Sequence, residues 1–125
     1  LSRGQRLRTA VAAMVAMRPE IVLLDEPTTG QDKKHIKQMM SALMERVETL
    51  VFCTHDVETA IGYATRVIVL DRGRIVADDH PRKIFADNRL LTGTGLRPTQ
   101  SWLVGQALGM DDVFTPLDLE ERWLC

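Results

Sequence analysis

Two adjacent carboxylates, Asp25 and Glu26, stand at the end of an apolar run and are followed at once by Pro27. A charge beside a buried strand costs free energy unless something binds it. A carboxylate suits Mg²⁺, which prefers oxygen ligands and keeps much of its water. A second carboxylate one residue on points elsewhere and can polarise an attacking water. The pair therefore predicts a site for a metal, an activated water or both, and the alternative is a pair of solvated loop charges.

An imidazole follows the next apolar run, because His55 comes two residues after the stretch Thr49 to Cys53. An imidazole can donate a hydrogen bond to a phosphate oxygen, or orient a water for phosphoryl transfer. Ligands of parallel α/β sheets bind beyond the carboxyl ends of the strands. We expect His55 and the acidic pair to share such a border and face one ligand, although a single histidine there is more often a satisfied strand-end residue.

The first residues of the chain predict the start of a helix. Ser2 and Gln5 have the spacing of a capping box, with Ser2 as the N-cap. The amino end of a helix attracts anions, and Gly4 allows a phosphate to approach the backbone closely. The stretch fits a seat for a phosphate, and the alternative is a plain capping box.

Hydrophobic periodicity predicts the elements that position these residues. In order, we expect a helix over 2–18, a strand over 21–24, a helix over 33–47 capped by Asp32, and a strand over 49–53. The apolar runs indicate strands buried on both faces of a sheet. Strand, helix and strand in succession make a βαβ unit with parallel strands and a right-handed crossover. The methionine-rich face of the second helix is interpreted as core packing.

Weaker signals organise the rest of the chain. We expect a short helix over 57–64 and then two antiparallel strands on either side of the turn Asp71-Arg72-Gly73. Pro81 opens another helix. The stretch "LLTGTGLRPTQ" is interpreted as a loop, "SWLVGQALGM" as a helix, and the final residues as a further short helix.

Composition is that of an ordinary globular protein, with 125 residues, 45% of them hydrophobic and 26% charged. The net charge of −1 argues against a dominant face for nucleic acid or anionic membranes. No apolar run approaches the roughly 20 residues of a membrane-spanning helix. We expect Cys53 to be a small buried hydrophobe and predict no disulfide with Cys125, which favours a reducing cytosol.

Four short motifs occur in a characteristic order. "LSRGQ", "IVLLDE", "TTGQD" and "THD" follow one another with spacings that resemble the ATPase subunits of ABC transporters, over residues 1–77. The resemblance implies an α/β fold: a partial P-loop NTPase domain with parallel strands flanked by helices, then a β-hairpin and a helical C-terminal tail. It implies that residues 1–86 are the C-terminal part of the ATPase domain and 87–125 a helical extension.

The resemblance also implies ATP and Mg²⁺ as cofactors and a role for the first residues. Leu1 to Gln5 match the signature motif, which contacts the γ-phosphate of a nucleotide held by the opposite subunit. The nucleotide-binding residues there would be Ser2, Arg3, Gly4 and Gln5.

Three further motifs carry over in the same way. Ile21 to Glu26 match Walker B, with Asp25 on magnesium and Glu26 as the catalytic carboxylate. His55 matches the catalytic switch histidine. The nucleotide-binding D-loop is matched by Gly30, Gln31 and Asp32.

The sequence departs from the family pattern at two positions. Arg3 stands where the signature motif usually has glycine, which adds a cation near the phosphate, and Gln31 replaces the commoner leucine of the D-loop. "TTGQD" with "AMRP" upstream looks like the energy-coupling-factor branch, which serves vitamin and transition-metal uptake. "GLRPTQSWLVGQALG" is similar to the C-terminal tail of that branch.

A P-loop is missing from the sequence, because none of the four lysines, Lys33, Lys34, Lys37 and Lys83, follows a glycine. Together with a first residue that is not methionine, this predicts a fragment that alone neither holds ATP tightly nor hydrolyses it. The resemblance implies a P-loop strand between the Walker B and switch-histidine strands, so its absence predicts a gap there, with unpaired strand edges on both sides.

Three functions compete at this point. The first is an ATPase subunit at the cytoplasmic face of the cell membrane that powers import of a small molecule, a vitamin or a transition-metal ion. Its partners would be a second ATPase subunit or domain and an integral membrane transport subunit, without nucleic acid. The second is a soluble ABC-type ATPase of DNA repair or translation, and the third is a non-catalytic interaction fragment.

Overall fold

A computed structural model describes the backbone of residues 2–124 and the side chains of residues 2 and 4–122. The expectations for Leu1 and Cys125 lie outside the described residues. The chain divides into two compact units, the first ending at His55 and the second beginning at Asp56. Among the described residues, no helix has both the length and the apolar character needed to cross a membrane.

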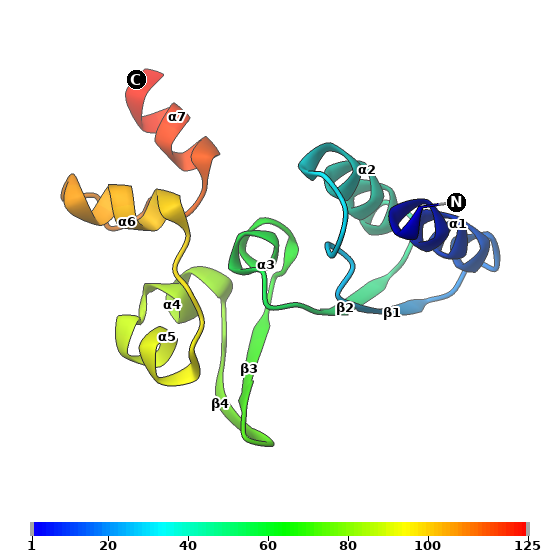
Figure 1. Cartoon of the computed structure of the whole chain (residues 1–125), viewed down its shortest axis with the longest axis horizontal. Coiled ribbons are helices and arrows are strands. Elements are labelled where there is room, and N and C mark those ends of the chain that lie inside the picture. Colours follow the sequence, from blue (N-terminus) through cyan, green and yellow to red (C-terminus); the bar gives the residue numbers. More distant parts are fainter. Residues whose placement is uncertain (1, 125) are drawn as a thin grey trace. The chain divides into compact units, whose positions relative to one another are not determined.

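The first unit is a βαβ arrangement preceded by a helix (Figure 1). Its elements are α1 (Arg3–Ala16), β1 (Ile21–Asp25), α2 (Lys33–Met44) and β2 (Thr49–Cys53). The two strands pair in parallel, with Ile21 opposite Thr49 and Asp25 opposite Cys53. The predicted order of elements and the parallel pairing are confirmed.

The predicted gap between these strands is wrong. β1 and β2 are hydrogen-bonded neighbours along their whole length, and the pairing continues at both ends. Before the strands, the Thr49 amide donates to the carbonyl of Glu20 at 2.9 Å, and after them the Glu26 amide donates to the carbonyl of Cys53 at 2.9 Å. Consecutive strands joined by one short crossover usually lie side by side, and that local rule holds here.

Burial of β1 and β2 on both faces is also wrong. Figure 1 shows α1 and α2 on the same side of the strand pair, and the β1 residues that face them, Val22 and Leu24, are 1% and 8% exposed. Ile21 and Leu23, which alternate with them, are 58% and 71% exposed. Cys53 lies on an exposed position too, so its expected burial is wrong. A continuous apolar run fixes the strand but not how many of its faces the chain covers.

The methionine-rich face of α2 packs in the core, as predicted. Met39, Met40 and Leu43 are buried. The helix ends at Met44, three residues earlier than expected, where Glu45 forms the C-cap and Met44 itself is half-exposed.

The second unit begins with α3 (Val57–Tyr63) and a β-hairpin of β3 (Val67–Asp71) and β4 (Arg74–Asp79). The strands pair antiparallel, as predicted. Arg72 and Gly73 join them, with φ angles of 47° and 75°. Positive φ at both residues is what a type I′ hairpin turn requires, and that turn follows the twist of the strands.

Four helices follow the hairpin: α4 (Pro81–Ala86), α5 (Asn88–Thr94), α6 (Gln100–Ala107) and α7 (Pro116–Leu124). The interpretation of residues 90–100 as a loop is wrong in its first half, which is α5. The Asp87 carboxylate caps this helix by accepting hydrogen bonds from the amides of Arg89 and Leu90, and Gly95 ends it at a φ of 72°. Leu91 holds the helix in place because it is only 2% exposed.

One hydrophobic core joins the hairpin and helices α3 to α6 of the second unit. Its members are Val57, Ala60, Val69, Ile84, Phe85, Leu91, Trp102 and Phe114. Trp102 and Phe114 stack with their ring centroids 4.5 Å apart, and the Arg82 guanidinium lies 5.3 Å from the Phe114 centroid. The core thus takes residues from both sides of position 86, and the division into 1–86 and 87–125 stays a prediction.

Candidate functional site

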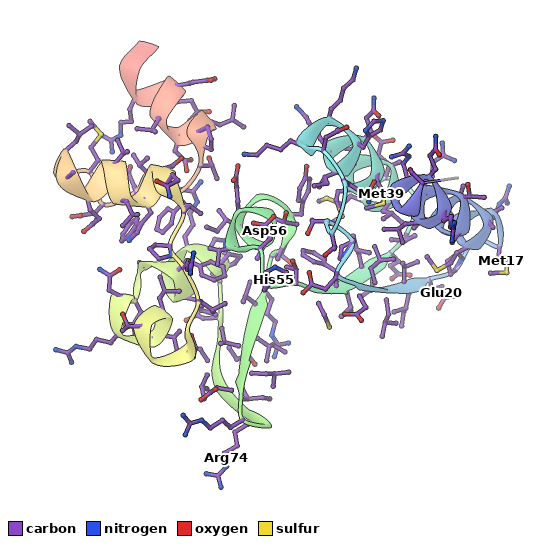
Figure 2. The ribbon with its side chains drawn as sticks, viewed as in Figure 1. Met17, Glu20, Met39, His55, Asp56 and Arg74 are labelled. Atoms are coloured by element: carbon purple, nitrogen blue, oxygen red, sulfur yellow. The ribbon has the colours of Figure 1, made fainter. Side chains whose placement is uncertain are left out.

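The carboxylate of Glu26 and the imidazole of His55 meet at one end of the strand pair. Glu26 follows β1 directly, and His55 comes two residues after β2. Nδ1 of His55 lies 2.7 Å from Oε1 of Glu26. Figure 2 places His55 where β2 ends and Glu20 at the opposite end of β1. The two residues therefore share the carboxyl border of the sheet, where parallel α/β sheets bind their ligands.

The backbone of Glu26 is held in an unusual conformation. Its φ is 46°, in the left-handed region that residues other than glycine seldom adopt. The conformation turns the chain sharply after β1, and the amide of Thr29 donates to the Glu26 carbonyl at 3.2 Å. Oε2 of Glu26 lies 3.5 Å from Oγ1 of Thr29. Strained backbone of this kind concentrates at functional sites, where surrounding contacts hold it in place.

Asp25 is the last residue of β1 and has an exposed side chain. Its carboxylate oxygens are the ligand type that Mg²⁺ prefers. Within the described side chains, no group of three or more histidine, cysteine, aspartate or glutamate residues is arranged to hold a metal. A single carboxylate such as that of Asp25 still fits Mg²⁺, which often takes one or two protein carboxylates and completes its shell with water and substrate phosphates.

The amino end of α1 is the predicted capping box. Oγ of Ser2 accepts a hydrogen bond from the Gln5 amide at 3.2 Å, and the Ser2 amide donates to Oε1 of Gln5 at 2.8 Å. Arg3 is the first residue of the helix, and its side chain lies outside the described residues. Gly4 is buried against the loop that follows β1: a Cβ atom there would lie 3.5 Å from the Gly30 carbonyl oxygen.

The loop between β1 and α2 carries the three D-loop residues. Gly30 has a φ of 75°, which suits glycine. Asp32 caps α2, with Oδ1 accepting from the His35 amide at 2.9 Å and Oδ2 lying 2.6 Å from Nδ1 of His35. The His35 amide, and then its ring, lower the pKa of Asp32 below its usual value. Sequence reasoning missed His35, although an aspartate cap followed by histidine three residues later was visible.

Gln31 joins this loop to α1. Its Nε2 donates to the Pro27 carbonyl at 2.7 Å, and its Oε1 accepts from Nη1 of Arg8 at 3.4 Å. Arg8 is a residue that sequence reasoning did not single out. The predicted residues thus form two contact groups in the first unit, Glu26 with His55 and Gly4 with Gln31. A hollow of about 790 Å³ between α1 and α2, lined by residues such as Val11 and Leu43, belongs to neither group.

Curated proteins similar to the chain are ABC transporter proteins. One from Methanosarcina acetivorans, described as an ABC transporter ATP-binding protein, is 49% identical over 113 residues, covering 90% of this chain and 18% of the relative. A protein of the same description from Enterococcus faecalis is 35% identical over 127 residues, 99% of this chain and 22% of the relative. The chain is thus similar, over nearly its whole length, to a segment of ABC transporter ATP-binding proteins. No protein-family model matches it.

Parts of solved ABC ATPase structures have the same fold as this chain. CbiO1 from Clostridium perfringens, described as part of the ABC transporter complex cbiONQ, aligns with a TM-score of 0.62 at 29% identity, over 88% of this chain and 44% of CbiO1. An ATP-binding cassette in its ADP conformation aligns with a TM-score of 0.63 at 18% identity, over 74% of this chain and 39% of its own. The predicted α/β fold is confirmed, and the chain spans about a fifth of the length of the curated relatives.

Proposed function

We propose that this chain carries the water-activating part of an ATP-hydrolysing site, and that the full-length ABC protein uses it to hydrolyse ATP. The observation that supports this most is the 2.7 Å contact between His55 and Glu26 at the carboxyl border of the strand pair. The chain has no P-loop, so the phosphates of ATP would be cradled by residues outside it.

Glu26 polarises the attacking water in this proposal. One carboxylate oxygen, Oε1, contacts His55, and the other, Oε2, accepts a 3.5 Å hydrogen bond from Thr29 and has a second lone pair for the water. The Glu26 side chain is 34% exposed, so a water can reach it. General-base assistance of this kind contributes roughly 10²–10⁴ in rate.

His55 holds that carboxylate and addresses the phosphate. Its Nδ1–H donates to Glu26, which orients the ring. A doubly protonated ring donates from Nε2 to a phosphate oxygen, whereas a neutral ring accepts there from a water. Either bond positions the reactants, and phosphoryl transfer depends mainly on positioning and charge stabilisation.

Asp25 is the residue that would hold Mg²⁺, through water or directly. When bound, the ion neutralises charge on the phosphates. Asp25 and Glu26 are consecutive but serve different partners, because the chain turns sharply at the positive φ of Glu26.

The amino end of α1 serves a second nucleotide in this proposal. Ser2, Arg3, Gly4 and Gln5 contact the γ-phosphate held by another ATPase subunit or domain, where unpaired helix amides favour an anion. Gly30, Gln31 and Asp32 belong to the same dimer interface. Each site then needs residues from two halves, and dimerisation is required for hydrolysis.

Transport is the cellular task that we propose, with hydrolysis powering import of a vitamin or a transition-metal ion through an integral membrane subunit. CbiO1, at 29% identity, is part of a transporter complex, and the curated relatives are transporter proteins. These names favour a site at the cytoplasmic face of the membrane over a soluble ATPase of DNA repair or translation.

Substitution of Glu26 tests the proposed reaction. In the full-length protein, Glu26→Gln is expected to keep ATP binding and to lower turnover by about 10²–10⁴, the contribution of a general base. Glu20→Gln is the matched control, because Glu20 is an exposed glutamate at the opposite end of β1 (Figure 2). Wild-type turnover in Glu26→Gln would remove Glu26 from this role.

A further inference from the structure

The Gln31 side chain hydrogen-bonds both to α1 and to the loop carrying Glu26. The donor end of its amide gives a 2.7 Å hydrogen bond to the carbonyl of Pro27, the residue that follows Glu26. The acceptor end accepts a hydrogen bond from Nη1 of Arg8, on the second turn of α1, at 3.4 Å. Both halves of the amide are therefore hydrogen-bonded, and Arg8 lies 23 residues before Gln31 in sequence.

Packing reinforces these two hydrogen bonds. Cγ of Gln31 lies 3.4 Å from the position that a Cβ atom on Gly4 would occupy, so the side chain closes directly over the first turn of α1. Nε2 also lies 3.9 Å from the sulfur of the buried Met39. The amide is half-buried, where a hydrogen bond lost without replacement by water is costly.

The chemistry of the position is specific to an amide. Leucine, the commoner residue at this place in the family, can neither donate to the Pro27 carbonyl nor accept from Arg8. Glutamate keeps the acceptor for Arg8, now as an ion pair, and loses the donor to Pro27. We call these two hydrogen bonds the Gln31 bridge, with an α1 arm to Arg8 and a loop arm to Pro27. Substitutions can remove the two arms separately.

We infer that Gln31 is a positioning residue that fixes the amino end of α1 relative to the Glu26 loop, and so aligns two half-sites with each other. The inference rests on the proposed function, in which Glu26 serves the nucleotide of its own half and α1 serves the nucleotide of the other half. Loss of the bridge then disturbs both sites, although Gln31 belongs to one chain. A displacement of about 1 Å in a catalytic constellation can cost about 10² in rate.

A mixed assembly of the full-length protein separates this role from general stability. One half carries Glu26→Gln, which silences the nucleotide site that this Glu26 serves, and the other half is wild type. The remaining hydrolysis therefore uses the Glu26 of the wild-type half and the α1 of the altered half. Adding Gln31→Leu to the altered half is expected to lower that remaining rate about tenfold. ATP affinity and the unfolding temperature of the assembly are measured alongside and are expected to hold.

Three further variants complete the test in the same altered half. Arg8→Met cuts only the α1 arm and is expected to reproduce most of the loss, even where Gln31→Leu impairs folding. Gln31→Glu keeps the Arg8 arm and is expected to restore part of the rate. Gln38→Leu, at an exposed glutamine of α2, is expected to change nothing.

The outcomes distinguish the inference from the proposed function. A remaining rate that Gln31→Leu and Arg8→Met leave unchanged overturns the role of Gln31 while Glu26 keeps its own. A rate loss that comes with a lowered unfolding temperature of the assembly, and that Gln31→Glu does not relieve, also overturns it. That combination would mark a structural defect. Undiminished hydrolysis in assemblies with Glu26→Gln in both halves contradicts the proposed function itself.

Discussion

His55 and Glu26 are 29 residues apart in sequence, yet Nδ1 of His55 lies 2.7 Å from Oε1 of Glu26. The register of the sheet produces this contact, because Asp25 is paired with Cys53 and each functional residue follows its strand within two positions. The hydrogen bond from the Glu26 amide to the Cys53 carbonyl extends the pairing by one residue. The position of the carboxylate is thus set by the strands as well as by the imidazole.

Ser2 is expected to act on the nucleotide site of the opposite half. Ser2→Ala removes a hydroxyl proposed to contact the γ-phosphate, which costs about 1–3 kcal/mol of binding when a polar partner is left unsatisfied. In mixed assemblies with Ser2→Ala in one half, hydrolysis is expected to fail at the site whose Glu26 belongs to the other half. Combining Ser2→Ala with Glu26→Gln in the same half or in opposite halves identifies that site.

The helix cap supplies the control for Ser2. Ser2 also accepts the Gln5 amide, so Ser2→Ala is expected to cost about 1 kcal/mol of helix stability as a lost N-cap. Asparagine caps helices as well as serine does, so Ser2→Asn separates capping from phosphate contact. Equal failure of both sites in the Ser2→Ala mixed assembly would contradict a role in the opposite half.

Two glycines in the second unit are expected to respond oppositely to alanine. A Cβ atom on Gly105, in α6, would lie 2.8 Å from Cβ of Val113 and 3.0 Å from the Met110 carbonyl oxygen. Val113 is fully buried, so Gly105→Ala is expected to cost about 1–3 kcal/mol through overpacking.

Gly93, in α5, is the matched position, because a Cβ atom there has open space around it. Gly93→Ala is expected to stabilise the helix by about 0.4–1 kcal/mol. Urea unfolding of the two variants, followed by tryptophan fluorescence, measures both effects. A Gly105→Ala variant as stable as Gly93→Ala would show that the close packing of α6 on residues 110–113 is wrong.

The carboxylate of Asp118 is expected to make the second unit sensitive to acid. Burial raises its pKa, but hydrogen bonds from Arg82 and from the amides of Phe114 and Thr115 outweigh this and hold the pKa below the usual 3.8. A carboxyl with a lowered pKa in the folded state stabilises the fold above its ordinary pKa. That stabilisation is lost as the pH falls below 3.8 and through the folded-state pKa.

Asp118→Asn tests this pH dependence. At pH 7 the variant is expected to lose roughly 1 kcal/mol of stability, because the hydrogen bonds lose their charge. Between pH 5 and the acid limit its stability is expected to fall less than that of the wild type. Glu120→Gln, at an exposed carboxylate of the same helix, is the control. Equal acid sensitivity of wild type and Asp118→Asn would contradict the assignment.

Local chemistry made parts of the fold predictable. The turn at Arg72-Gly73 and the capping box of Ser2 and Gln5 depend on a few neighbouring residues, and both are present as expected. The helix α5 was missed because its glycine and threonines resemble a loop, although Asp87 was in place to cap it.

Features that depend on distant residues were less predictable. The apolar run at Ile21 to Leu24 predicted a strand but not its single covered face. The gap between β1 and β2 was expected from the family resemblance, whereas the rule that consecutive strands lie side by side would have given the observed pairing. The contact of Gln31 with Arg8 joins side chains from two elements, and no sequence spacing predicts it.

The rate of ATP hydrolysis in a His55 and Glu26 double-mutant cycle tests the shared site most directly. If the imidazole acts through the carboxylate that it contacts, then His55→Ala slows the wild type strongly but has little further effect on Glu26→Gln. The full-length protein is predicted to give this non-additive result with ATP affinity retained. A double variant whose rate loss equals the product of the two single losses would contradict the shared site. A His55→Ala variant as fast as wild type would contradict it too.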